Sequence, residues 1–241
     1  MLQGDRVELT GEILHHVRDV CRQRLGDRFE VILDGVNSGQ AILVEVIGER
    51  KGSSIARVLS SRALPELPVP HLELVLAIPR LPVFEAVIEK AVELGVKSLQ
   101  PVFSEFSFIR SDERVLTQKQ ERFGKIVRSA TQQSGRGDLM RILPPRSLEE
   151  ILQPVNREAS LPGLFAYEGE GRLSLRDALK AVPKASKKLS LFVGAEGGYS
   201  AKEVELFRTV EMLPVSLGAQ VLRVETACVA MISIIKYELG L

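Results

Sequence analysis

Two loops late in the sequence carry the residue types of a site that binds a small molecule through its backbone. Residues 194–200 read Gly-Ala-Glu-Gly-Gly-Tyr-Ser, and residues 217–227 read Leu-Gly-Ala-Gln-Val-Leu-Arg-Val-Glu-Thr-Ala. Glycine permits positive φ and lets a ligand approach backbone amides closely. An ordinary tight turn explains one glycine, but three glycines that flank a short acidic side chain favour a binding loop.

The flanking residues place each loop between a strand and a helix. Residues 189–193 are a short apolar run typical of a buried strand, and Ser200 with Glu203 forms the capping-box signature of a helix start. The stretches 213–217 and 227–237 repeat this order. Tandem units of this kind bring both loops to one edge of a parallel sheet, where α/β proteins bind cofactors. A dinucleotide-binding fold is disfavoured, because no G-x-G-x-x-G is present and the loop comes late in the chain.

The composition is that of a soluble globular protein with one or two domains. Of 241 residues, 45% are hydrophobic and 26% are charged, and the net charge of +1 means that a nucleic-acid site must arise from local charge. Cys21, Cys228, His15, His16 and His71 show no metal spacing, and we expect reduced thiols and structural histidines. The start has no signal-peptide pattern and no apolar run could span a membrane, so we expect a cytoplasmic protein.

The first 66 residues have the pattern of a small β-barrel. Four segments alternate or run apolar between tight-turn residues, namely 6–10, 28–34, 40–47 and 54–61. A helical pattern at residues 12–24 interrupts them, and strands spaced this closely are typical of a barrel. Three prolines within residues 65–70 predict a semi-rigid linker, so we place the domain boundaries at residues 1–66 and 71–241.

From residue 71 onwards, strands and helices alternate, which is the pattern of a parallel α/β sheet. The predicted strands lie at residues 71–78, 97–104 and 162–168, and the predicted helices at 83–94 and 115–134. The strand at 162–168 precedes the first glycine loop, and we expect it to form a third wall of the same site through Tyr167.

The helix predicted at residues 115–134 is locally basic. Between residues 110 and 146, nine Lys and Arg stand against four acidic residues. Exposed helices are often basic for solubility alone, but an excess of this size in a nearly neutral chain favours a phosphate-facing patch. Arg122, Lys125 and Arg128 form the centre of this patch.

Both glycine-containing loops resemble motifs of the RsmE family, knotted methyltransferases of the SPOUT superfamily that methylate uridine N3 in small-subunit (16S) ribosomal RNA. The resemblance extends to residues 16–27, 77–80, 89–96, 104–107 and 133–136. The chain departs from the family pattern at Ala195 and Ala219, where Pro is usual, and at Gln220, where Arg is frequent. It departs again at Phe106, where Arg is usual, and at Gln132, where Glu is usual.

The resemblance implies a PUA-like RNA-binding β-barrel followed by a SPOUT α/β domain with a trefoil knot around a mostly parallel sheet. It also implies S-adenosylmethionine as methyl donor, a small-subunit RNA or assembled subunit as substrate, and a homodimer, with no metal and no membrane. The predicted cofactor residues are Tyr167, Gly194, Glu196, Gly197, Gly198, Leu217, Gly218, Leu222, Thr226 and Ala227. The predicted RNA-binding residues are Arg22, Arg80, Lys90, Arg122, Lys125 and Arg128. Taken alone, Lys90 and Arg22 would be read as solvated surface charges.

Methyl transfer from a sulfonium needs two reactants held in line more than it needs acid–base residues, which suits a chain without a catalytic triad. Uridine N3 must lose its proton, and a nearby cation would stabilise the uracil anion. Arg136 and Arg223 are the catalytic candidates. Arg223 has the alternative of pairing with Glu225 or capping a helix, and Arg136 that of binding a helix carbonyl or a phosphate.

The target base must be unpaired or flipped, because N3 lies on its Watson–Crick edge. Two further functions stay open at the level of the sequence. One is a SPOUT methyltransferase that acts on another RNA base, and the other is a non-catalytic RNA-binding member of the fold.

Overall fold

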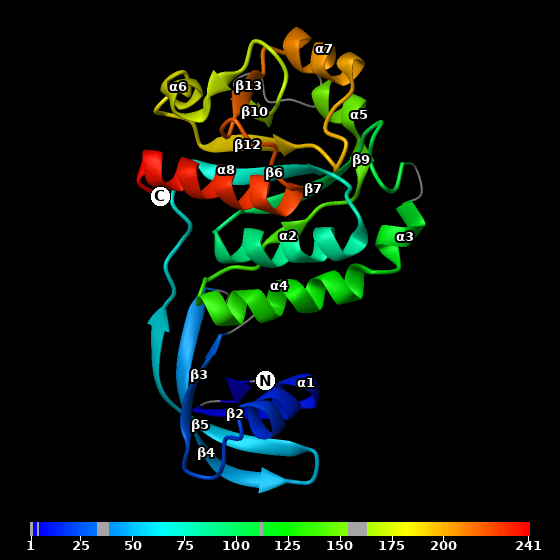
Figure 1. The fold of residues 1–241 in the computed structure, drawn as a ribbon. Helices are drawn as coiled ribbons and strands as arrows, with labels where there is room; N and C mark the ends of the chain where they lie inside the picture. The colour runs from blue at the N-terminus through cyan, green and yellow to red at the C-terminus, as the bar shows by residue number, and fades with distance from the viewer. Residues whose placement is uncertain (1, 4, 33–38, 111–112, 154–162) are drawn as a thin grey trace. The chain divides into compact units, whose positions relative to one another are not determined.

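The computed structural model describes residues 2–3, 5–32, 39–110, 113–153 and 163–241 (Figure 1). The chain divides into two compact units, Met1–Glu66 with Gly135–Asp138 and Leu67–Ser134 with Leu139–Leu241. No helix in the described ranges combines the length and the apolar character that crossing a bilayer requires.

The first unit is built on a five-stranded antiparallel sheet. Its strands run in the order β1 (Leu2–Gln3), β2 (Arg6–Thr10), β5 (Ser53–Ala63), β4 (Gln40–Arg50) and β3 (Arg28–Ile32). Alternate residues of β2 and β4 point into one small core that contains Leu9, Ile42 and Val44. Two β-bulges bend β4 against β5. The four strands predicted in this part are confirmed, and residues 33–34 of the second lie outside the described residues.

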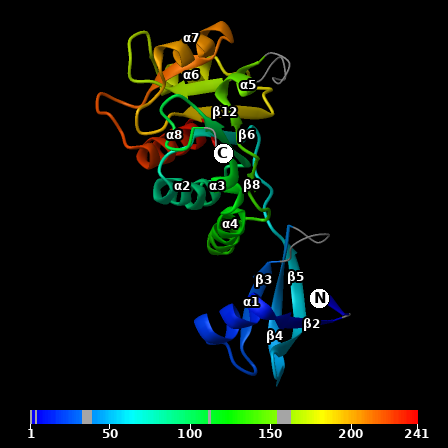
Figure 2. The same ribbon diagram turned by 90° about the vertical axis from the view of Figure 1, so that its right-hand side faces the viewer.

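The helix predicted at residues 12–24 is wrong in length and type. An α-helical turn, α1 (Gly11–His15), runs into the π-helical turn η1 (His16–Val20), and the chain leaves the helix after Cys21. Arg22 has φ 57, and a left-handed residue cannot continue a right-handed helix. The last part of the predicted helix is therefore a loop. Figure 2 shows α1 beside the strands that it contacts, β2 and β5.

The second unit is an α/β domain in which every pairing between described strands is parallel. The strand order is β11-β13-β10-β12-β6-β7-β8, with β9 also paired to β7. The strands are β6 (His71–Ala77), β7 (Ser98–Phe103), β8 (Arg141–Ile142), β9 (Arg146–Ser147), β10 (Gly163–Ala166), β11 (Leu173–Ser174), β12 (Lys188–Val193) and β13 (Leu213–Ser216). The predicted parallel α/β sheet is thus confirmed.

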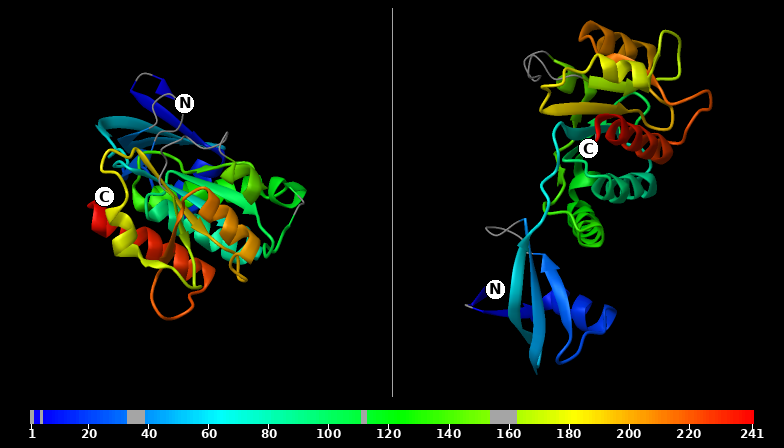
Figure 3. Two further views of the ribbon diagram at one scale, coloured as in Figure 1. Left: turned by 90° about the horizontal axis from the view of Figure 1, so that it is seen from above. Right: turned by 90° about the vertical axis from the view of Figure 1, so that its left-hand side faces the viewer.

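The two faces of this sheet bury different helices. One core joins Leu72, Leu74 and Leu76 of β6 to helices α2 (Leu81–Glu93), α4 (Gln120–Ser134), α6 (Leu175–Lys180) and α8 (Val224–Leu239). The other joins Val75 and Ala77 to α5 (Leu148–Leu152) and α7 (Ala201–Thr209). Successive residues of one strand therefore serve opposite layers, as the pleat requires. Figure 3 shows α8, α2 and α4 in one layer beside the sheet.

The basic helix predicted at residues 115–134 is two helices. A short helix, α3 (Glu113–Thr117), ends where the Lys119 amide donates to the Leu116 carbonyl three residues earlier, and α4 begins at Gln120. This tighter bond interrupts the α-helical hydrogen-bond ladder. The helix predicted at residues 83–94 is confirmed as α2, and Gly95 follows it with φ 78.

Candidate active site

A cleft of about 740 Å³ opens where β10, β12 and β13 reach their carboxyl ends. These three strands are neighbours in the parallel sheet, so the loops that follow them meet at one edge. Four segments line the cleft, within residues 80–83, 166–169, 193–199 and 215–227. The two loops thus line one cleft, and the end of the strand before them contributes to its wall; the role of this cleft as a cofactor site stays a prediction.

The glycines of the first loop are required by contacts within the protein. A Cβ on Gly194 would lie 2.9 Å from the Gly198 Cα, and Gly198 itself has φ 70 and donates its amide to the Ala195 carbonyl at 2.9 Å. A Cβ on Gly197 would lie 2.9 Å from the Cβ of Phe106. A tight turn and its packing thus account for all three glycines, more than the sequence alone indicated.

Glu203 ties this loop to two other parts of the unit. Its carboxylate accepts the Ser200 amide at 2.8 Å, while the Ser200 hydroxyl accepts the Glu203 amide at 3.4 Å, so the predicted capping box is confirmed. The second carboxylate oxygen accepts the amide of Glu105 at 2.8 Å, 98 residues away in sequence. Glu203 is buried, and one side chain therefore fixes the start of α7 and the turn after β7 together.

The second loop presents unused backbone donors to the cleft. Gly218 has φ 132, and its carbonyl accepts the Ser216 hydroxyl at 2.9 Å. Within the part of the chain that the structure describes, the amides of Leu217 and Leu222 donate to no protein acceptor. Both residues line the cleft. Because partly buried amides need partners, these two donors suit a ligand with hydrogen-bond acceptors.

Two arginines stand on the cleft wall. Arg80 and Arg223 occupy the N-cap positions of α2 and α8 and are exposed. Arg223 makes no side-chain cap bond, and across the described ranges it forms no ion pair with Glu225. Arg223 thus stands at a helix cap without a side-chain cap bond, and the pairing with Glu225 is absent from the described residues. The Glu196 carboxylate accepts the backbone amide of Arg80 at 3.1 Å, which holds the first loop to the start of α2.

Aromatic rings support the first loop from behind. Tyr199 packs edge-on against Phe207 with ring centroids 4.8 Å apart, and Phe207 stacks on Phe165 at 4.4 Å. Burial, followed by the charge of Glu203, raises the pKa of the Tyr199 hydroxyl well above its ordinary value. The phenol thus stays neutral and keeps the floor of the loop apolar.

Comparison with known proteins agrees with this geometry. A family model described as an RNA methyltransferase domain matches residues 65–236. The chain belongs to this RNA methyltransferase family. The ribosomal RNA small subunit methyltransferase E of Bacillus subtilis is 28% identical over 95% of this chain and 89% of its own length. That of Buchnera aphidicola (subsp. Schizaphis graminum) is 27% identical over 97% and 91%.

A solved structure extends the similarity to the fold. The ribosomal RNA small subunit methyltransferase E of Neisseria gonorrhoeae, bound to S-adenosyl methionine, matches 98% of this chain and 93% of its own with a TM-score of 0.83 and 26% identity. The names of these relatives confirm the resemblance to the RsmE family that the two loop motifs indicate. The protein is therefore an RNA methyltransferase.

The methyltransferase brings most of its predicted cofactor residues together. All ten except Thr226 line the cleft, and Thr226 is an exposed residue in the first turn of α8. Of the two catalytic candidates, Arg223 lines the cleft. Arg136 belongs to the first compact unit, where it is buried and donates to Asp138 at 3.1 Å. Sequence reasoning could not foresee this, because the glycine before Arg136 suggested a mobile joint.

The basic residues of α4 differ in their partners. Arg122 makes a two-pronged ion pair with Glu85 of α2, with bonds of 2.5 and 2.6 Å, which raises the pKa of Arg122. Lys125 pairs with Glu121 at 3.1 Å. Arg128 lines a second, largely apolar cavity of about 390 Å³ beside α4. Three neighbouring cations in sequence thus have three different environments.

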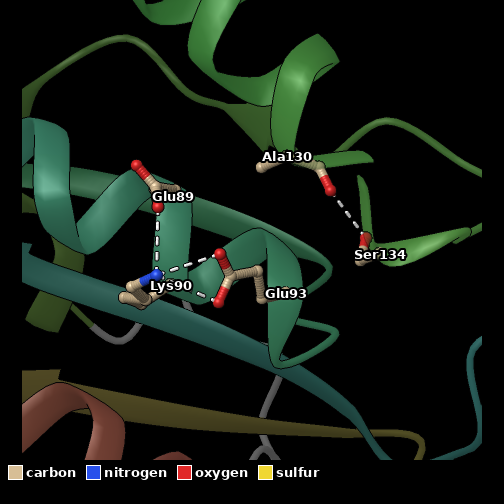
Figure 4. Close-up of polar contacts among 5 residues, drawn as sticks. All are labelled: Glu89, Lys90, Glu93, Ala130 and Ser134. Carbon is tan, nitrogen blue, oxygen red and sulfur yellow. Dashed lines mark hydrogen bonds and ion pairs between the residues drawn. The ribbon is translucent and has the colours of Figure 1, made fainter. Parts of the chain in front are cut away.

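Lys90 lies between two carboxylates of its own helix (Figure 4). Its ammonium donates to Glu89 and to Glu93 at 3.0 Å each. Both bonds raise the pKa of Lys90, and the bond to Glu89 contributes most. The group holds one positive and two negative charges. It therefore offers a phosphate little net attraction, although RNA binding by Lys90 stays a prediction. In the same view the Ser134 hydroxyl donates to the Ala130 carbonyl at 2.7 Å, inside α4.

Proposed function

We propose that this RNA methyltransferase transfers the methyl group of S-adenosylmethionine to N3 of a specific uridine in 16S ribosomal RNA. The observation that carries the proposal is the meeting of two loops, 194–200 and 217–227, in one cleft at the edge of a parallel sheet. The similarity to a small subunit methyltransferase E structure that holds S-adenosyl methionine supports the choice of cofactor.

The cleft fits this cofactor in size and chemistry. Small-molecule sites usually enclose about 300–1,000 Å³, and this cleft lies within that range. The amides of Leu217 and Leu222 would donate to acceptors of the cofactor, and the side chains of these two residues would contact its apolar parts. The charged lining consists of Glu168, Glu196, Glu225, Arg80 and Arg223, a slightly negative balance that suits a sulfonium. When bound, the cofactor supplies an activated methyl group.

Arg223 is the catalytic residue that the cleft favours. Its exposed guanidinium has no protein carboxylate near enough to pair with in the described chain, so its charge is available to a substrate. A fixed cation beside uracil would lower the cost of the N3 anion, and a planar fork of donors would orient the base. Arg80, on the same cleft wall, would neutralise an adjacent phosphate. Arg136 is the second candidate, and it would have to leave Asp138 to act.

The remaining parts of the proposal concern assembly. We propose that the first unit is a PUA-like barrel that binds RNA, with Arg22 exposed at its left-handed turn. The second unit would be a SPOUT domain in which α8 passes through a trefoil knot. The protein would be a homodimer and would act in the cytoplasm. Tyr237 on α8 is 85% exposed and Ile234 37% exposed, which supports a partner surface on this helix.

Mass mapping of 16S ribosomal RNA from cells with and without this gene tests the function. We expect loss of one methyl group on uridine N3 when the gene is absent. Loss from a different base would favour the alternative of a SPOUT methyltransferase with another target. An unchanged map, together with RNA binding by the purified protein, would favour the non-catalytic alternative.

A further inference from the structure

We propose that Phe106 is a stacking platform for an unpaired RNA base at the rim of the cleft. This inference rests on the proposed function, because it takes RNA as the ligand. Phe106 lies in the turn that follows β7, and 41% of its surface is exposed. A planar aromatic ring offers every base a π-face, so stacking on it does not depend on sequence.

The turn that carries Phe106 is held rigidly from both sides. The Ser104 amide donates to the Ser107 hydroxyl at 3.0 Å, and the two serine hydroxyls are 2.9 Å apart. Both serines are buried, and the Glu105 amide between them donates to Glu203 at 2.8 Å. An exposed ring on a rigid turn loses little freedom when a base stacks on it, which favours binding.

The ring lies against the cofactor loop. Gly197 lines the cleft, and a Cβ added to it would lie 2.9 Å from the Cβ and 3.1 Å from the Cγ of Phe106. Phe106 itself is not among the residues that line the cleft, although it packs against Gly197, which is. A base stacked on this ring would therefore sit beside the cleft mouth, not inside it.

A positive charge lies at the same edge of the sheet. The amide of Phe108 donates to the Ile78 carbonyl at 2.8 Å, which joins the turn to the end of β6 two residues before Arg80. Arg80 is exposed on the cleft wall, so a cation for the RNA backbone stands near an aromatic surface for a base. Proteins bind single-stranded RNA by this combination of charge and aromatic stacking.

Phe108 provides the matched comparison. It is 60% exposed and lies two residues further along the same turn, but the three atoms nearest to a Cβ added at Gly197 all belong to Phe106. If mere apolar exposure attracted RNA, both rings would bind it. If the position beside Gly197 decides, only Phe106 will.

The sequence contains no tryptophan, so Phe106→Trp and Phe108→Trp each introduce a single reporter. In a titration of each full-length variant with a single-stranded oligouridylate, we expect quenching of tryptophan emission for Phe106→Trp and little change for Phe108→Trp. We expect Phe106→Leu to weaken oligouridylate binding by roughly 10- to 100-fold and Phe108→Leu to leave it within about two-fold. Thermal melting checks that the leucine variants stay folded.

Absence of quenching at position 106, equal quenching at both positions, or wild-type affinity in Phe106→Leu would each overturn the platform. The same holds if the wild type fails to bind oligouridylate, or if Phe106 proves to bind a protein instead. Failure of the proposed function is a separate result. If the protein binds oligouridylate with quenching at position 106 but never methylates uridine, the proposed function fails and the platform stands. If Phe106→Leu methylates as well as the wild type, the platform fails and the proposed function stands.

Discussion

Replacement of Glu203 tests whether one buried carboxylate holds the site together. Its oxygens accept two backbone amides, from Ser200 and Glu105, at 2.8 Å each. A hydrogen bond to a charged group contributes about 1.5–3 kcal/mol, so Glu203→Ala should lower the free energy of unfolding by about 3 kcal/mol or more. For a chain of this size that corresponds to a fall in Tm of roughly 6–12 °C. Glu203→Gln keeps one acceptor oxygen and should lose about half as much.

Glu150 is the matched control, because it occupies the same capping-box position in α5. Its carboxylate accepts the Ser147 amide at 3.3 Å, but the residue is exposed and near Arg146. Glu150→Ala should cost about 1 kcal/mol, the usual contribution of a helix cap. Urea unfolding and calorimetry of S-adenosylmethionine binding measure both variants. Equal destabilisation by the two substitutions would refute the view that Glu203 does more than cap α7.

Gly218→Val should weaken S-adenosylmethionine binding about ten-fold or more in calorimetry, because the φ of Gly218 is 132 and the residue lines the cleft. The control Gly52→Val, at φ 83 in the first unit, should leave the affinity unchanged. Arg223→Ala should slow methyl transfer by roughly 100- to 1000-fold in single-turnover kinetics with cofactor affinity preserved, and a normal rate would exclude a catalytic role. Arg128→Gln should lower the slope of log affinity for RNA against log salt concentration by about one. Arg122→Gln should leave this slope unchanged, since Glu85 already pairs with Arg122, and equal slopes for the two variants would contradict this distinction.

Local patterns in the sequence predicted the parts of the site that depend on short-range geometry. The Ser200–Glu203 capping box is a contact between residues three apart, and it appears where the pattern placed it. The meeting of the two loops follows from a general property of parallel strands, whose carboxyl ends share one edge. Neither prediction required knowledge of which strands are neighbours.

Contacts between distant segments could not be predicted, because hydrophobic periodicity does not encode them. The bond from Glu105 to Glu203 and the packing of Phe106 on Gly197 both join the turn after β7 to the loop after β12. The Arg122–Glu85 pair joins two helices in the same way. The sequence predicted three equivalent cations on α4, but this pair gives Arg122 a carboxylate partner from another helix. Phe106, at a position where the RsmE family usually carries Arg, can therefore be interpreted only together with Gly197, which it contacts in the folded protein.

We propose that the cleft between the two loops transfers a methyl group to uridine N3. The most direct test supplies purified protein with S-adenosylmethionine labelled in its methyl group and with small-subunit ribosomal RNA or assembled subunits, then identifies the labelled nucleoside. We predict that the label appears as 3-methyluridine and that Gly218→Val diminishes it when S-adenosylmethionine is below saturation. Label in any other nucleoside, or undiminished label with Gly218→Val, would contradict the claim.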